Sequence, residues 1–176
     1  MDAIELLRWQ CRRTYEWLEL TVSDVTPEQA RWRPPGMANS IAANYAHAVI
    51  WADVDIMRHF HSRDPLLAVW GAKLGVMEDA AQPGSLIPDE WGAEFDWTVL
   101  REYGRAVRDS VERLVDELNP AELERRFQMQ PVRLGMWTGL DVYDLHVNHH
   151  IRLHGGEIAC LKGLQGARGY LGGADG

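Results

Sequence analysis

One stretch of the chain, residues 140–161, carries histidines and apolar residues in the phase of an α-helix. His146, His150 and His154 recur every four residues, and side chains at this spacing lie on one face of a helix. The same face carries five apolar residues at spacings typical of a helix packed against a core: Leu140, Tyr143, Val147, Ile158 and Leu161. His150 and His154 are therefore expected to face inward, where an imidazole needs a partner.

Two imidazoles on adjacent helical turns form half of a metal site. Histidine nitrogens bind a divalent ion such as zinc at about 2.0–2.1 Å, so His150 and His154 could share one ion. The alternatives are a histidine-rich surface or a pair of hydrogen-bonded core histidines. The zinc-protease pattern H-E-x-x-H is absent, because Ile151 stands at the position of its glutamate.

A third candidate ligand, His47, lies in a second helical segment, residues 40–61. It belongs to an apolar row made of Ala43, Ile50, Val54 and Met57. A histidine in such a row is more often a packed core residue than a ligand, so the weight of His47 comes from its pairing with the two histidines of the other helix. Three ligands leave one coordination position for water or substrate. His59 and His61, about three turns from His47, are expected at the surface.

The whole pattern of apolar periodicity predicts an all-α fold, a four-helix bundle with helices at about 2–22, 40–61, 96–118 and 138–162. The expected capping residues of the last three are Asn39 or Ser40, Asp96 and Thr138. The connections between the second and third helices and between the third and fourth helices are long. The first of these, residues 62–95, is expected to hold a short helix near 66–72. Its length permits the second and third helices to run parallel. The other is expected to hold a turn at 121–124 and an extended segment at 127–134.

Length and composition set wider limits. A chain of 176 residues predicts a single domain, residues 1–176, that needs neither disulfide nor metal merely to fold. Cys11 and Cys160 form no C-x-x-C motif, which indicates free thiols in a reducing compartment. We expect a cytoplasmic protein, because the chain shows no signal-peptide pattern and no apolar run of membrane-spanning length. The net charge of −8 disfavours nucleic acid as a partner. The glycine-rich tail, residues 163–176, is expected to be loose at its end.

Two motifs carry a family resemblance. Pro-Pro-Gly-Met-Ala-Asn-Ser-Ile, followed by Asn-Tyr-Ala-His47, resembles the second helix of the DinB superfamily (DinB/YfiT-like proteins). The segment 148–158, Asn-His-His-Ile-Arg-Leu-His-Gly-Gly-Glu-Ile, resembles the H-x-x-x-H pattern of that family's fourth helix, with its following small residue, Gln or Glu, and Ile. The resemblance covers nearly the whole chain in element order and length. It implies a bundle that binds one divalent metal ion, often zinc or nickel, through His47, His150 and His154.

The resemblance also implies an enzyme that acts on a small-molecule substrate. Characterised relatives include mycothiol-dependent maleylpyruvate isomerase and bacillithiol S-transferases, so a low-molecular-weight thiol is the implied second cofactor. This chain has Leu153 and Gly155 where relatives often carry His and Arg. That departure affects an expected anion or thiol contact near position 155 and leaves the three metal ligands intact.

Several residues near the predicted ligands could have more than one role. Glu157 lies one turn beyond His154, where it could orient a ligand histidine, act as general base, or reach solvent. His146 could support the ligands from behind, and His149, about 100° from His150 around the helix, is expected at the surface. Trp51 and Tyr143 could line the pocket or pack in the core.

Three functions remain open from the sequence. The first is a metal-dependent enzyme, either a thiol-dependent transferase or isomerase or a metal-activated hydrolase. The second is a non-catalytic metal or small-ligand binding bundle in stress response. The third is a structural homodimer module whose histidines are packed or exposed, since two-fold dimers are the commonest oligomers.

Overall fold

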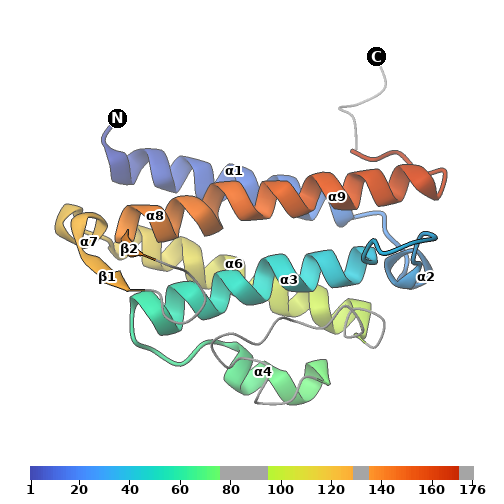
Figure 1. Ribbon diagram of the computed structural model, residues 1–176, viewed down its shortest axis with the longest axis horizontal. Coiled ribbons are helices and arrows are strands. Elements are labelled where there is room, and N and C mark those ends of the chain that lie inside the picture. Colours follow the sequence, from blue (N-terminus) through green and yellow to red (C-terminus); the bar gives the residue numbers. More distant parts are fainter. Residues whose placement is uncertain (76–94, 129–134, 171–176) are drawn as a thin grey trace.

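The structure is a computed structural model that describes residues 1–75, 95–128 and 135–170. Four long helical rods lie side by side in it (Figure 1). The first rod is α1 (Ala3–Val22), and the third is α6 (Trp97–Glu117). The other two are composite: the second joins α3 (Ile41–Asp53) to η1 (Val54–Phe60), and the fourth joins α8 (Gly139–Asp144), η3 (Leu145–His149) and α9 (His150–Leu164). The four predicted helices are thus confirmed to within two residues at each end.

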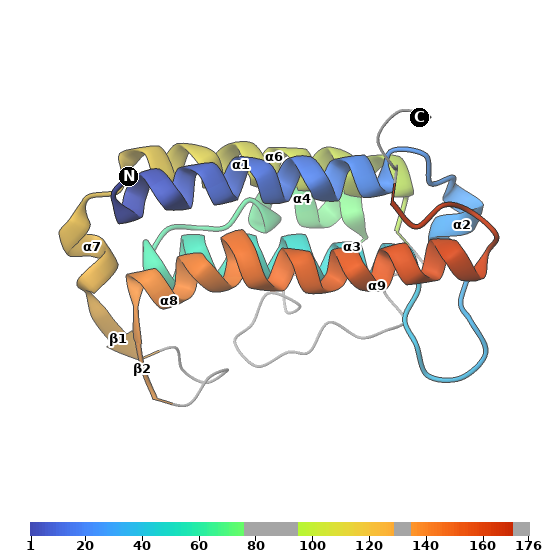
Figure 2. The ribbon, with the colours of Figure 1, turned by 90° about the horizontal axis from the view of Figure 1, so that it is seen from above.

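The rods close into a four-helix bundle, as predicted. Helices α1 and α3 each pack against both α6 and α9. Figures 1 and 2 show that α3 runs parallel to α6, whereas α3 and α9 run in opposite directions. The long connection between α3 and α6 is therefore a crossover. No helix in the described ranges is long and apolar enough to cross a membrane.

Smaller elements complete the ends and the crossover. The predicted short helix in the crossover is α4 (Leu67–Leu74), which packs on α6. The predicted turn near residue 121 is α7 (Pro120–Glu124), and α2 (Pro27–Arg31) follows α1. Strands β1 (Arg126–Gln128) and β2 (Met136–Thr138) pair antiparallel. The predicted extended segment is confirmed at 127–128, and its remainder, 129–134, lies outside the described residues, as do most of the first long connection and the last residues of the tail.

Capping side chains begin the helices where the sequence predicts. Ser40 accepts a hydrogen bond from the backbone N–H of Ala43, and Asp96 caps α6. Thr138 and Asp141 form a capping box at the start of α8. Each such cap satisfies backbone donors that the first helical turn leaves unpaired.

The crossover is held to the core by one buried carboxylate. Asp53 accepts hydrogen bonds from the backbone N–H groups of Leu66 and Leu67, at 3.0 and 2.8 Å, and from the Tyr103 hydroxyl at 2.8 Å. Burial raises the pKa of Asp53 above its ordinary value, while these hydrogen bonds act in the opposite direction. Asp53 therefore joins α3, α6 and the chain that leads into α4.

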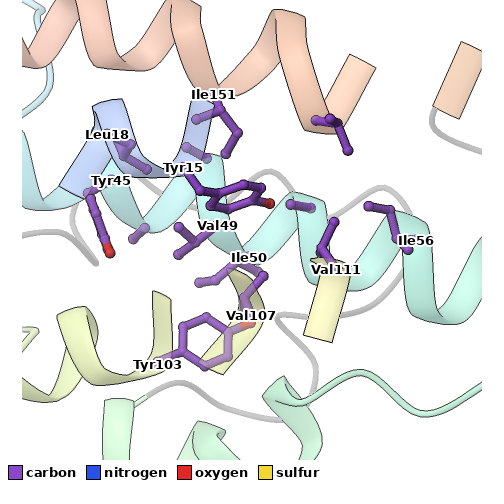
Figure 3. Packing of buried hydrophobic residues seen from close by; sticks show 14 of the residues in the cluster. Tyr15, Leu18, Tyr45, Val49, Ile50, Ile56, Tyr103, Val107, Val111 and Ile151 are labelled. Carbon is purple, nitrogen blue, oxygen red and sulfur yellow. The ribbon is translucent and has the colours of Figure 1, made fainter. Parts of the chain in front are cut away.

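The core lies between the four rods (Figure 3). Helix α1 buries a stripe of residues that recur at helical spacing: Ile4, Leu7, Cys11, Tyr15, Leu18 and Val22. The apolar row predicted for the second helix is part of a wider buried surface, because every residue of α3 except His47 is buried. Helices α2, α6 and α9 pack around α3, so its small apolar side chains are covered on all sides. Leu140, predicted to face inward, is 43% exposed, because it lies in the first turn of α8 at the end of the bundle.

Two π-helical segments, η1 and η3, interrupt the second and fourth rods. A π-turn bonds residue i to residue i+5, and such turns often occur at functional sites. They change which side chains face the partner helix, and this shift was not predicted from the sequence. The segments meet in the core, where Asp55 of η1 and His146 of η3 lie 2.6 Å apart between Oδ2 and Nε2.

Candidate metal centre

The structure brings the three predicted ligand histidines together. His47 of α3 lies across from His150 and His154 of α9, because the two helices pack antiparallel. The ring centroids are 5.1 Å apart for His47 and His150, 4.7 Å for His47 and His154, and 4.6 Å for His150 and His154. One nitrogen from each ring lies within 4.8 Å of the other two. Three imidazoles from two helices therefore converge on one point.

The geometry of this cluster fits a divalent ion. His150 Nε2 and His154 Nε2 are 3.2 Å apart, and two nitrogens bound tetrahedrally to one zinc ion lie about 3.4 Å apart. The donor set also fits, since imidazole suits zinc, nickel, copper and iron. All three histidines are partly buried, so the cluster keeps access to solvent. His47 is the one residue of α3 that is not fully buried.

Glu157 contacts a ligand histidine. Its Oε2 lies 2.7 Å from His154 Nδ1, and its side chain is 53% exposed. An ionised carboxylate accepts a hydrogen bond from Nδ1–H, which leaves the Nε2 lone pair of His154 directed at the cluster. Of the three roles considered for Glu157, this contact fits the orientation of a ligand.

His146 is a fully buried histidine behind the cluster. Its Nε2 pairs with Asp55 Oδ2, and its ring meets the His150 ring edge to face at 5.4 Å. The sequence reasoning missed Asp55. The signal that could have found it is a charged residue within an otherwise apolar helical run, because a buried charge requires a partner.

The remaining candidates occupy different places. His149 is exposed, as predicted. Tyr143 is buried against Phe60, with ring centroids 5.4 Å apart, and thus belongs to core packing. Trp51 is 9% exposed, and its ring centroid lies 6.2 Å from that of His47. The Gly155 backbone is covered by the Trp17 indole, which a side chain at position 155 would overlap.

The prediction that His59 and His61 lie at the surface is wrong. The His59 side chain is 13% exposed, with Nε2 3.8 Å from Asp55 Oδ1, and His61 Nε2 lies 2.7 Å from the Tyr143 hydroxyl. His61 follows η1 and meets Tyr143 of the fourth rod, a contact that the sequence of one helix does not reveal. Burial lowers the pKa of both histidines, and the neighbouring Arg58 and Arg63 lower those of His59 and His61 further.

Stability is expected to fall on acidification because of these two histidines. The unfolded chain binds protons at a histidine pKa of about 6.5, whereas the folded protein resists protonation at His59 and His61 to lower pH. Lowering the pH from about 6.5 toward the lower pKa values of the folded protein therefore favours unfolding. Urea unfolding at pH 7.5, 6.5 and 5.5 measures the free energy of unfolding at each pH. His61→Gln should reduce the slope of this free energy against pH. A slope that is the same in His61→Gln would contradict the role of this residue.

Comparisons with known proteins agree with this architecture. A family model described as the DinB superfamily matches residues 10–158. The crystal structure of a conserved protein from Enterococcus faecalis superposes with a TM-score of 0.76 at 17% sequence identity, covering 94% of this chain and 99% of that one. This likeness shows the fold alone. No curated protein matches the chain. Since the family model spans most of the sequence, the chain belongs to the DinB superfamily.

Proposed function

We propose that this protein is a metal-dependent enzyme whose single divalent ion, zinc or nickel, is held by His47, His150 and His154. The observation that carries the proposal is the convergence of three ring nitrogens within 4.8 Å of one another. A site with three protein ligands leaves a position for water or substrate, which is typical of catalytic rather than structural zinc. Membership of the DinB superfamily supports the same reading.

The chemistry of the site follows from the charge of its ligands. A divalent ion bound by neutral imidazoles keeps its full positive charge and supplies a Lewis acid that lowers the pKa of water or thiol. The neighbouring protein residues hold and orient the ligand histidines. Glu157 fixes the tautomer of His154 through the 2.7 Å contact, and His146, anchored on Asp55, packs against His150.

The finer proposal is a transferase or isomerase that uses a low-molecular-weight thiol. The chain has two cysteines. Cys11 is buried, and burial raises the pKa of its thiol to about 12, so it stays protonated at neutral pH. Cys160 is exposed and lies beyond the cluster on α9. An external thiol would therefore supply the nucleophile. Such thiols are abundant in reducing compartments, which suits a cytoplasmic enzyme with free cysteines.

The test is metal and thiol binding by protein purified without a histidine tag. Elemental analysis should give about one divalent ion per chain. Cobalt-substituted protein should develop a sulfur-to-metal charge-transfer band with mycothiol, bacillithiol, glutathione or cysteine. Absence of an ion after reconstitution with zinc and nickel would refute the metal site. An ion together with indifference to all four thiols would leave a hydrolase or a non-catalytic binding bundle.

A further inference from the structure

Trp51 presents a buried hydrogen-bond donor beside the histidine cluster. It follows His47 by one helical turn, so the two side chains share a face of α3. That face packs against α9, and the two rings are in contact, at a centroid distance of 6.2 Å. The indole Nε1 is shielded from solvent and has no hydrogen-bond partner in the described part of the chain.

An unpaired indole N–H at this depth calls for an explanation. A buried donor without an acceptor destabilises a fold, and buried tryptophans usually place their N–H on a partner. Trp97 of the same core does so, since its Nε1 donates to the backbone carbonyl of Val25 at 3.0 Å. The exception at Trp51 coincides with the side of α3 that carries His47. The missing acceptor is therefore expected from a ligand of the cluster.

We propose that Trp51 donates its indole N–H to a carboxylate group of the substrate held at the His47–His150–His154 cluster. This inference rests on the proposed function. A cluster of three neutral imidazoles leaves the positive charge of the ion uncompensated, which favours an anionic ligand. A carboxylate has two oxygens, one to bind the ion and one to accept a hydrogen bond from the indole N–H. A thiolate offers a single sulfur, which is a weaker hydrogen-bond acceptor than a carboxylate oxygen. Trp51 therefore favours substrates that carry a carboxylate.

Cobalt-substituted protein provides the binding test, with absorption titrations of acetate and of 2-mercaptoethanol. In Trp51→Phe we expect acetate to bind about tenfold more weakly, since a hydrogen bond to a charged acceptor is lost. The affinity for 2-mercaptoethanol should stay within about twofold. The matched control is Trp9→Phe, at a tryptophan of α1 that is 56% exposed, and it should change neither affinity. Equal acetate affinity in Trp51→Phe and the unmodified protein would overturn the proposal, as would an equal loss for both ligands.

A second measurement on the unmodified protein keeps the proposal testable if Trp51→Phe does not fold. In the zinc-loaded protein labelled with ¹⁵N, the indole N–H of Trp51 is one of eight such signals. It can be assigned through correlations that link the indole N–H to the backbone of Trp51. Saturating acetate should move this proton downfield, while the Trp9 signal stays in place. A Trp51 signal that does not move would overturn the inference alone, whereas a chain without any ion would overturn the proposed function as well.

Discussion

Replacing His150 with alanine is expected to weaken metal binding by more than about 100-fold while the bundle stays folded. His150 supplies one of the three converging nitrogens, and loss of a direct ligand should exceed the 10–100-fold effect typical of residues that only support a ligand. The fold should persist because the shared core of the four rods is extensive and does not require the ion. Competition with a chelator measures the affinity, and circular dichroism measures the helix content.

Two further variants provide a control and an intermediate case for the loss of metal affinity. His149→Ala removes the exposed neighbour of His150 and should leave metal affinity unchanged. Glu157→Gln keeps the size of the side chain but weakens its hold on His154 Nδ1, so we expect an intermediate loss of about 10–100-fold. Collapse of the helical signal in His150→Ala would make the metal structural. Retention of the ion in that variant would refute the assignment of this ligand.

Asp55→Ala is expected to lower the free energy of unfolding by about 3–5 kcal/mol, the usual cost of removing one partner of a buried ionisable pair. Asp55 and His146 are both 0% exposed and 2.6 Å apart. Without the carboxylate, the His146 ring keeps a polar nitrogen that neither water nor another described side chain satisfies. His59 also loses its nearest carboxylate. Urea unfolding followed by circular dichroism measures the change.

Two further variants distinguish the loss of the buried Asp55–His146 contact from the effect of removing an aspartate elsewhere. Asp109 lies on the exposed side of α6 and pairs with Arg108 at the surface, so Asp109→Ala should change stability by less than about 1 kcal/mol. The double variant Asp55→Ala, His146→Leu should be more stable than Asp55→Ala alone, since it removes the His146 ring that Asp55→Ala leaves unpaired. If Asp55→Ala is as mild as Asp109→Ala, the buried pair does not stabilise the fold.

The helices could be predicted because each is encoded within its own segment. The stripe of α1, with Leu7, Cys11 and Tyr15 one turn apart, needs no knowledge of the partner helix. The same holds for the caps, in which a side chain such as Ser40 bonds to a backbone group three residues away. The pair His150 and His154 is likewise local, since both lie on successive turns of α9.

Contacts between helices were harder to predict because they depend on register. Asp55 meets His146 across 91 positions of sequence, through two π-helical segments that leave no clear pattern in the residues. The inward positions of His59 and His61 have the same origin. The burial of α3 on all sides follows from its place among α2, α6 and α9. The sequence of an apolar helix does not specify which neighbours will cover it.

The sequence by itself determined the four helices, their caps and a histidine pair in helical phase, because hydrophobic periodicity and capping act over a few residues. It offered His47 as a candidate third ligand from its place in an apolar helical row, and the family resemblance implied the same residue. The tertiary structure alone decided that α3 and α9 run antiparallel in the register that places His47 against His150 and His154. It also placed Trp51 beside them with its indole N–H unpaired. Such contacts are set by the packing of distant segments, whose relative register no local pattern specifies.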